Sequence, residues 1–446
     1  MLALCAAAGP AAAQEDTVPP WETWQPPAVE MPDPNAWEIY LRAFSLSEAI
    51  EQRLEDELGE GAQTTLDMSE ATLEPETLAR LVDAYAPVFS ALEAAIAGKT
   101  RVPPIMSRED IDESFEEFAY ARQSCRMFAC RSVHHLQRED PLSAALDGVA
   151  SMRIGSDIGT HGSLVSGLVQ IACTAIGEAR LREAIPLLGA DEARIVAGAL
   201  RDVIARAPGF ADALVGEETL SRLLARELLP QFEGIDEAIK GLRDDLDYAR
   251  RVLAQEDPAV AEMDDAALNA LIEEKAAQMK AMAPDRIWEE LGDFYAEWQI
   301  EAAKTLWARQ PVHAPENPIL QQLTPSFEKS GMKYAVSDAR LRVDLAAAAA
   351  QAFKGETGVY PASLEQLVPE YLPEVPRDPF EDAPLRTIAQ DPVSRAHPAS
   401  QRTPTGASVL TIYSVGPDRD DDRGMDVGRG ADEDTDGDIA VTLRAG

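Results

Sequence analysis

The 446-residue sequence is short of positive charge, of cysteine and of aromatic residues. It has 40 lysines and arginines against 78 aspartates and glutamates, a formal net charge of −38. This balance excludes a general surface for nucleic acid or anionic membrane, because both need a basic patch. Four cysteines are too few for a disulfide-stapled mini-protein or a multi-zinc scaffold. Beyond the N-terminus no uncharged apolar run approaches the roughly 18 residues of a membrane-spanning helix, so we expect no membrane span.

Catalytic motifs are also missing. The sequence has no nucleophile elbow, no P-loop, no dinucleotide glycine fingerprint and no HExxH zinc helix. His161, His313 and His397 have no acid or nucleophile at a meaningful spacing, and we expect the many paired carboxylates to lie on solvated helix faces. The sequence therefore predicts no catalytic residue, although a hydrolase with an unrecognised site between helices stays an alternative.

The sequence does contain enough apolar residues, 46 %, for a sizeable core divided among two or three domains. Residues 1–13 are small and apolar, and Ala11-Ala12-Ala13 before Gln14 is typical of the end of a secretory signal peptide. This pattern predicts export to the periplasm or the cell exterior. Residues 14–35 are rich in proline, which predicts an extended surface leader without a regular helix.

Apolar residues at spacings of three and four predict a long helical region from 36 to 310. The clearest segments are 36–58, 74–96, 111–136 and 163–184, and the last is apolar nearly all round, which indicates a central helix. No fixed period of a regular solenoid is present. We therefore expect a mainly α fold, an irregular antiparallel helical array.

The pattern changes after a proline-rich linker at 311–333. Beyond it the sequence predicts a helix over 334–353, a polar mobile loop from 391 to 406, and strands over 409–414 and 439–443. The expected organisation is a signal peptide at 1–13, a leader at 14–35, a helical domain at 36–310, a linker at 311–333 and a small α+β domain with an acidic loop at 334–446.

Two motifs of the C-terminal part are similar to the globular part of the type II secretion major pseudopilin. Residues 357–380 read TGVYPASLEQLVPEYLPEVPRDPF, and residues 412–418 read IYSVGPD. In that family a long helix precedes a Tyr-Pro turn, a short helix, an Asp-Pro-Phe corner and strands that end in a calcium-binding acidic loop. The resemblance implies a pseudopilin-like fold over about 335–446. It departs from the family because a long helical region replaces the membrane-spanning N-terminal helix.

A second resemblance concerns the helical region. Residues 114–218, with SCRMFACRS, the apolar segment 164–176 and ALVGEE, are similar to uncharacterised secreted helical proteins of planctomycete type that carry the same C-terminal module. This resemblance implies relatives and gives no activity.

The acidic stretch from 418 to 438 is the main candidate metal site. It holds ten carboxylates and three arginines, so it repels itself unless a cation binds, and carboxylate oxygens suit Ca²⁺. Asp432, Asp434 and Asp436 alternate before Gly437, but Leu443 stands where an EF-hand needs its last glutamate. A solvated acidic tail is the alternative. The predicted calcium ligands are Asp418, Asp420, Asp434, Asp436 and Asp438.

The cysteines offer a weaker possibility. Cys125 and Cys130 lie about 140° apart around a helix and cannot bond to each other, whereas pairing of either with Cys173 stays open. Cys130, His134, His135 and Cys173 can also be combined into a soft-metal site, and buried apolar cysteines are the alternative.

Taken together, these features predict a non-catalytic secreted or cell-envelope protein. Its helical array offers surfaces to a protein or peptide partner, with Trp21 and Trp24 of the leader as anchors. Its C-terminal domain is predicted to be a calcium-stabilised cap. A specialised component of a type II secretion or pilus-like assembly is the second hypothesis. The sequence predicts no oligomeric state.

Overall fold

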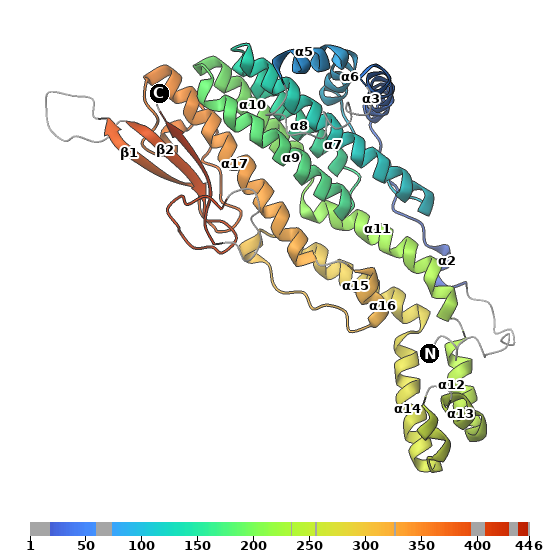
Figure 1. The fold of residues 1–446 in the computed structure, drawn as a ribbon. Coiled ribbons are helices and arrows are strands. Elements are labelled where there is room, and N and C mark those ends of the chain that lie inside the picture. The colour runs from blue at the N-terminus through green and yellow to red at the C-terminus, as the bar shows by residue number, and fades with distance from the viewer. Residues whose placement is uncertain are drawn as a thin grey trace.

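The computed structural model describes residues 18–58, 74–232, 234–254, 257–324, 327–393, 406–427 and 436–444. The fold is mainly helical, with a small three-stranded antiparallel sheet near the C-terminus, which confirms the predicted class (Figure 1). The helices are α2 (Pro20–Thr23), α3 (Trp37–Leu58), α5 (Pro75–Ala84), α6 (Ala86–Ala97), α7 (Arg108–Gln137), α8 (Pro141–Gly159), α9 (Leu164–Ala184), α10 (Ala190–Arg206), α11 (Phe210–Leu228), α12 (Ile235–Asp244), α13 (Leu246–Leu253), α14 (Asp265–Ala281), α15 (Pro284–Ala302), α16 (Pro318–Leu323) and α17 (Phe327–Thr357). Short 3₁₀ segments are η2 (Ile185–Leu187), η3 (Leu229–Phe232), η4 (Pro258–Glu262), η5 (Leu306–Ala308) and η6 (Leu364–Leu367).

Helices α8 and α9 form a closely packed pair at the centre of the fold. Their backbones meet at two glycines, since a Cβ on Gly177 would lie 2.2 Å from the carbonyl oxygen of Gly148. Only glycine fits such an approach without moving the backbone. Helix α9 also contacts α7, α11 and α17, so the prediction of a central helix at 163–184 is confirmed.

The predicted single helix over 74–96 is two helices, α5 and α6, that meet at Tyr85. Pro87 stands in the first turn of α6. A proline there lacks the N–H that would continue the preceding helix, but it is tolerated in the first turn of a new one. The break is therefore local proline chemistry within a correctly predicted helical region.

The proline-rich leader differs from the expected extended surface segment. It contains the four-residue helix α2, which begins at Pro20, where proline's missing N–H costs nothing. The Trp21 side chain is 4 % exposed and packs among residues of α11 and α15. The Trp24 ring lies 5.7 Å from that of Trp288. Both tryptophans thus pack within the chain, and Trp21 is not exposed to a partner.

Helix α17 runs between the sheet on one side and helices α9 and α10 on the other (Figure 1). It is buried on several faces, and the alanines from Ala346 to Ala350 are all fully buried. Side chains this small let helices and sheet approach closely on different sides of one helix. The largest hydrophobic cluster therefore includes α8, α9, α10, α17 and the sheet, and the segments on either side of the predicted linker share one core.

The sheet has the order β1-β2-β3, formed by β1 (Arg386–Val393), β2 (Gly406–Ser414) and β3 (Ile439–Arg444). In the register, Leu410 lies opposite Leu443, and both pack on α17. The sequence predicts β2 and β3 but not β1, whose Pro392 disfavours a strand assignment. A proline is tolerated because β1 is an edge strand. Of the polar loop predicted at 391–406, the part from 394 to 405 lies outside the described residues.

A network of buried charges holds α17 against α9. Arg182 Nε donates a hydrogen bond of 2.7 Å to Asp344 Oδ1, and Arg182 also forms an ion pair of 2.8 Å with Glu178. Glu178 accepts a second hydrogen bond, of 3.2 Å, from Arg340. The Arg182 guanidinium reaches the carbonyl oxygen of Ala440 at 3.4 Å, so the network extends to β3. Two arginines thus balance two carboxylates between the helical array and the C-terminal segment.

One helical segment, Leu164–Leu187, is long and apolar enough to cross a membrane by length and composition, with a mean hydropathy of 1.3 over its best window. The sequence analysis predicts no membrane span and interprets this segment as a central helix. In the fold, 56 % of that window is buried inside the protein. Its Glu178 and Arg182 form ion pairs with Arg340 and Asp344 of α17. These contacts are typical of a core helix, which passes the same length and composition test.

Candidate metal site

The acidic loop leaves the end of β2 at a fixed point. Asp378, in the Asp-Pro-Phe corner, is 3 % exposed and accepts hydrogen bonds from Ser414 Oγ at 2.8 Å and from the Val415 amide at 2.9 Å. The same carboxylate accepts the amide of Phe380 at 2.9 Å. A buried carboxylate with three donors holds both segments in place. The two sequence motifs singled out above therefore meet in the structure.

The other arm of the loop is held at the start of β3. The amide of Asp438 donates to the carbonyl of Met425 at 2.7 Å, and the amide of Val427 donates to the carbonyl of Asp438 at 2.9 Å. These bonds accompany a parallel bridge between Asp426 and Asp438. The chain segments around 425 and 438 therefore lie side by side, which brings aspartates far apart in sequence to the same place.

Two glycines allow the arms to cross. Gly416 has a φ of 75° and Gly437 has a φ of 121°. Residues with a Cβ rarely adopt these values. A Cβ on Gly416 would lie 2.4 Å from the carbonyl oxygen of Gly437. The loop closes at this contact because neither residue carries a side chain.

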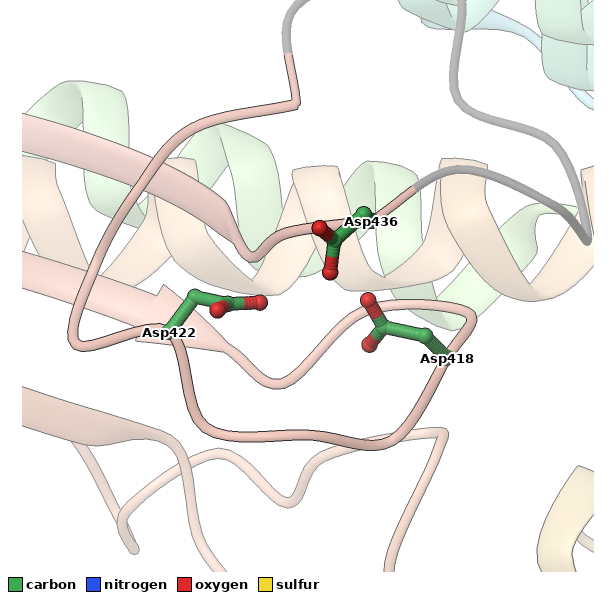
Figure 2. A group of neighbouring side chains, drawn as sticks. All are labelled: Asp418, Asp422 and Asp436. Atoms are coloured by element: carbon green, nitrogen blue, oxygen red, sulfur yellow. The ribbon is translucent and has the colours of Figure 1, made fainter.

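Three carboxylates converge above this crossing. One oxygen from each of Asp418, Asp422 and Asp436 lies within 4.8 Å of the other two, and Figure 2 shows the three side chains pointing toward one another. Asp418 is fixed by two backbone donors, the amide of Asp420 at 3.1 Å and the amide of Gly437 at 2.8 Å. The second of these bonds ties the two arms of the loop together.

Asp422 carries the clearest sign of an uncompensated charge. Its Oδ2 atom is buried and has no hydrogen-bond partner in the described structure. Partial burial, followed by the negative charges of Asp436 and Asp418, raises the pKa of the Asp422 carboxyl above its ordinary value. Among the described residues, no lysine or arginine forms an ion pair with Asp418, Asp422 or Asp436. The group is therefore anionic and unbalanced.

Asp438 lies next to this group and is fully buried. Its Oδ2 accepts a 2.6 Å hydrogen bond from the Gly424 amide, while its Oδ1 has no partner in the described structure. Burial, and then the charge of Asp421, raises the pKa of Asp438 to about 6 despite the hydrogen bond from Gly424. Asp438 is thus a second carboxylate in the same loop that has no cationic partner in the described structure.

The predicted ligands fall into three groups. Asp418 and Asp436 are in the converging set, and Asp438 is buried beside it. Asp420 is outside the converging set, and its Oδ1 accepts the amide of Asp421 at 2.8 Å. Asp434 lies outside the described residues. Asp422 was not predicted, because three consecutive aspartates give no sequence signal for which one faces inward.

This arrangement can bind a hard divalent cation. Carboxylate oxygens are the ligands that Ca²⁺ prefers, and Ca²⁺ accepts six to eight of them in flexible geometry. The buried Asp422 oxygen without a partner is the observation that fits such a group, because a buried polar atom ordinarily has one. Asp418, Asp422 and Asp436 would supply the carboxylates.

The alternative soft-metal group is not assembled among the described residues. Cys130, His134, His135 and Cys173 do not converge, and His135 instead has a nitrogen 3.7 Å from a carboxylate oxygen of Asp147. The three cysteines of the described chain are buried and form no disulfide.

Cys125 and Cys173 are neighbours in the core. Burial raises the pKa of the Cys125 thiol, and its hydrogen bond with Cys173 raises it further. The structure therefore favours buried, unreactive thiols, and of the two open pairings it brings Cys125 together with Cys173.

Sequence reasoning missed one further contact. His161 Nδ1 lies 3.2 Å from Ser163 Oγ, although no acid or nucleophile partner for His161 is predicted from the sequence. Gly162, with a φ of 84°, turns the chain sharply between the two residues. Glycine in a His-Gly-Ser sequence just before a predicted helix was the available signal.

No protein-family model, no curated protein and no solved structure matches this chain. The expected pseudopilin-like fold therefore stays a prediction from the sequence motifs, and the structure shows only a long helix packed on a small antiparallel sheet.

Proposed function

We propose that this chain is a non-catalytic binding protein of the cell envelope or exterior, in which a helical scaffold contacts a protein or peptide and a C-terminal cap is stabilised by Ca²⁺. The observation that carries the cation proposal is the Asp422 oxygen, which is buried without a partner beside two further carboxylates. The cap is the segment from α17 to β3, in which the acidic loop connects β2 to β3.

The cation would have a structural role in the loop and no catalytic role. Asp418 and Asp422 come from the arm after β2, and Asp436 comes from the arm before β3. A divalent cation between them neutralises their mutual repulsion and joins the two arms. Because β3 packs on α17 and reaches the Arg182 network, the stabilisation extends to the docking of the cap.

Thermal unfolding of the full chain tests this proposal. A cation that binds only the folded state stabilises it by about 2.7 kcal/mol at roughly 100 times its dissociation constant, so the unfolding midpoint should rise between chelator and Ca²⁺. Mg²⁺, which demands a tighter octahedral shell, should raise it less. Asp422→Asn should abolish the response, while Asp293→Asn, an exposed change on α15, should keep it. Equal midpoints of the unchanged chain in Ca²⁺ and chelator would contradict the site.

A more specific proposal for the cap is a pseudopilin-like domain, which supports the alternative of a component associated with a type II secretion or pilus-like assembly. The coarse arrangement behind it is a long helix packed on a small antiparallel sheet, with Asp378 of the Asp-Pro-Phe corner bound to the start of the acidic loop. Affinity capture from envelope extract distinguishes the alternatives: recovery of secretion-system subunits favours assembly, and recovery of other partners favours the scaffold.

The hydrolase alternative has one observation behind it, the contact between His161 and Ser163. Two facts weigh against a nucleophile. Ser163 is 3 % exposed, and its Oγ accepts the amide of Ser166 at 3.1 Å as the N-cap of α9. Ester hydrolysis by the full chain that disappears in Ser163→Ala would replace the binding proposal with an enzyme.

A further inference from the structure

A large hollow lies between the leader and the first turns of two helices. It has a volume of about 1000 Å³ and is lined by residues of the leader and α3, by residues 103–117 and by His161. None of these residues belongs to the acidic loop. The hollow is therefore a second candidate site, at a place that the cation does not reach.

Its charge is of one sign. The side chains of Asp33, Glu38, Asp110 and Glu117 line it, and the described lining contains no lysine or arginine. Asp110 is partly engaged, since it accepts the amides of Met106 and Ser107 at 2.8 Å each. Glu38 lies 4.0 Å from the guanidinium of Arg42 in an exposed pair, which is weak in water. The acidic lining still attracts a cationic ligand, and the net charge of −38 strengthens the attraction at long range.

His161 provides an independent observation that points to a ligand. The side chain is 8 % exposed, and its ring packs edge-on against Phe118 at 5.4 Å between centroids. Burial lowers the pKa of His161 to about 4, so the ring is neutral at pH 7. Nδ1 contacts Ser163, whereas Nε2 forms no hydrogen bond in the described structure and the residue lines the hollow.

The hydrogen bonds around Ser163 determine what Nε2 offers. Ser163 Oγ accepts the amide of Ser166, and we assign its hydroxyl hydrogen to the bond with His161 Nδ1. In this tautomer His161 Nε2 carries the proton and is a donor. An N–H without a partner in the described structure, on a largely buried side chain that lines the hollow, fits an acceptor such as a peptide carbonyl oxygen.

Apolar surface completes the hollow. Leu41 is 39 % exposed and Met106 is 48 % exposed, and both line it together with Trp37. The aliphatic part of a lysine or arginine side chain packs on such surface while its charged end reaches a carboxylate.

We propose that this hollow binds a basic, extended peptide segment of a partner protein. The lysine or arginine side chains of the segment contact Asp33 and Glu38, and a carbonyl oxygen of its backbone accepts from His161 Nε2. The inference rests on the proposed binding role and specifies the chemistry of the partner.

Fluorescence anisotropy with the full chain tests the inference. The probe is a labelled, end-capped octapeptide of alternating lysine and alanine, and the matched probe has glutamate in place of lysine. We expect the lysine peptide to bind, with an affinity that falls as salt rises, and the glutamate peptide not to bind. Asp33→Asn with Glu38→Gln should weaken binding roughly tenfold. The matched pair Glu289→Gln with Glu297→Gln removes the same charge from exposed positions of α15 and should leave binding unchanged.

A third variant tests the donor. His161→Phe keeps a ring against Phe118 but removes the N–H, so we expect binding roughly fivefold weaker, the loss of about one hydrogen bond. Unchanged binding in His161→Phe, equal losses in the two charge pairs, or absence of lysine-peptide binding at low salt would each overturn the inference. Spermidine that binds as tightly as the peptide, with the same response to the variants, would also overturn it, in favour of a small-polyamine site.

The same samples separate this inference from the cation proposal. Thermal unfolding in Ca²⁺ and chelator shows whether each variant is folded and whether the cap responds. A calcium response without peptide binding removes the hollow as a site and keeps the cap. Peptide binding without a calcium response removes the cation and keeps the hollow.

Discussion

The helical centre and the acidic loop both crowd carboxylates together, but only the centre supplies its own cations. Between α9 and α17, Glu178 and Asp344 are paired with Arg182 and Arg340. In the loop, Asp418, Asp422 and Asp436 converge with no such partner among the described residues. A buried charge needs a partner in either place. The centre therefore pairs its carboxylates with arginines of the chain, although Asp344 Oδ2 is buried without a hydrogen-bond partner in the described structure. The loop has no such arginine on its three converging carboxylates, and a cation from solution is our proposal for what balances them.

The largest effect should come from breaking the balance at the centre. Arg182→Ala leaves Asp344 and Glu178 without their shared cation, and burial already raises the pKa of the Asp344 carboxyl. Removing one partner of a buried ion pair costs about 3–5 kcal/mol. We expect the urea midpoint to fall accordingly. Arg243→Ala is the control, because it breaks an exposed pair with Glu273 and should leave the midpoint nearly unchanged. A similar loss in both variants would mean that Arg182 contributes no more than a surface residue.

A smaller effect should come from packing at the same centre without any change of charge. In Gly177→Ala the new Cβ would lie 2.2 Å from the Gly148 carbonyl oxygen, so α8 and α9 must separate. Overpacking of this kind typically costs about 1–3 kcal/mol. Gly198→Ala is the matched control, because its Cβ would meet only the end of Arg201 at 3.9 Å. Urea unfolding of the two variants measures the difference, and an equal stability would show that the helix pair is not as close as described.

The centre and the loop also differ in how far the sequence predicts them. Apolar periodicity over 163–184 gives α9 within one residue at its start, since burial follows the helical period. Strand β1 is not predicted from the sequence because it contains Pro392. A proline is tolerated in an edge strand, and which strand lies at the edge is known only from the assembled sheet. In the loop, Asp418 and Asp436 are predictable from acidic density and the nearby glycine.

Asp422 is not predictable in this way, because the inward-facing member of three aspartates is set by backbone turns. Arg419 and Arg423, on either side of that run, have φ values of 61° and 57°, which non-glycine residues rarely adopt. Local composition does not encode which side chain such a turn directs inward. The side-chain directions in the loop depend on the closed fold, and the helix positions at the centre do not.

The smallest predicted effect is the pH dependence of stability that Asp438 of the acidic loop causes. The pKa of Asp438 is raised to about 6 in the folded state, whereas an unfolded aspartate has a pKa of about 4. The folded state therefore holds its proton more tightly, and the free energy of unfolding falls as pH rises from about 4 to about 6. Asp438→Asn removes this charge and keeps an oxygen to accept the Gly424 amide.

In chelator, Asp438→Asn and the unchanged chain should be equally stable near pH 4. At pH 8 the variant should be more stable by about 1 kcal/mol. This is less than the pKa shift of Asp438 alone would give, because the neighbouring aspartates are exposed and water screens their charges. The matched change Asp202→Asn, at an exposed position of α10, should show no such divergence. Urea titrations at the two pH values measure it. If Ca²⁺ makes the unchanged chain as stable as the variant at pH 8, the cation neutralises carboxylates in the loop as arginine does at the centre. If the variant stays more stable in saturating Ca²⁺, the cation does not compensate the charge of Asp438.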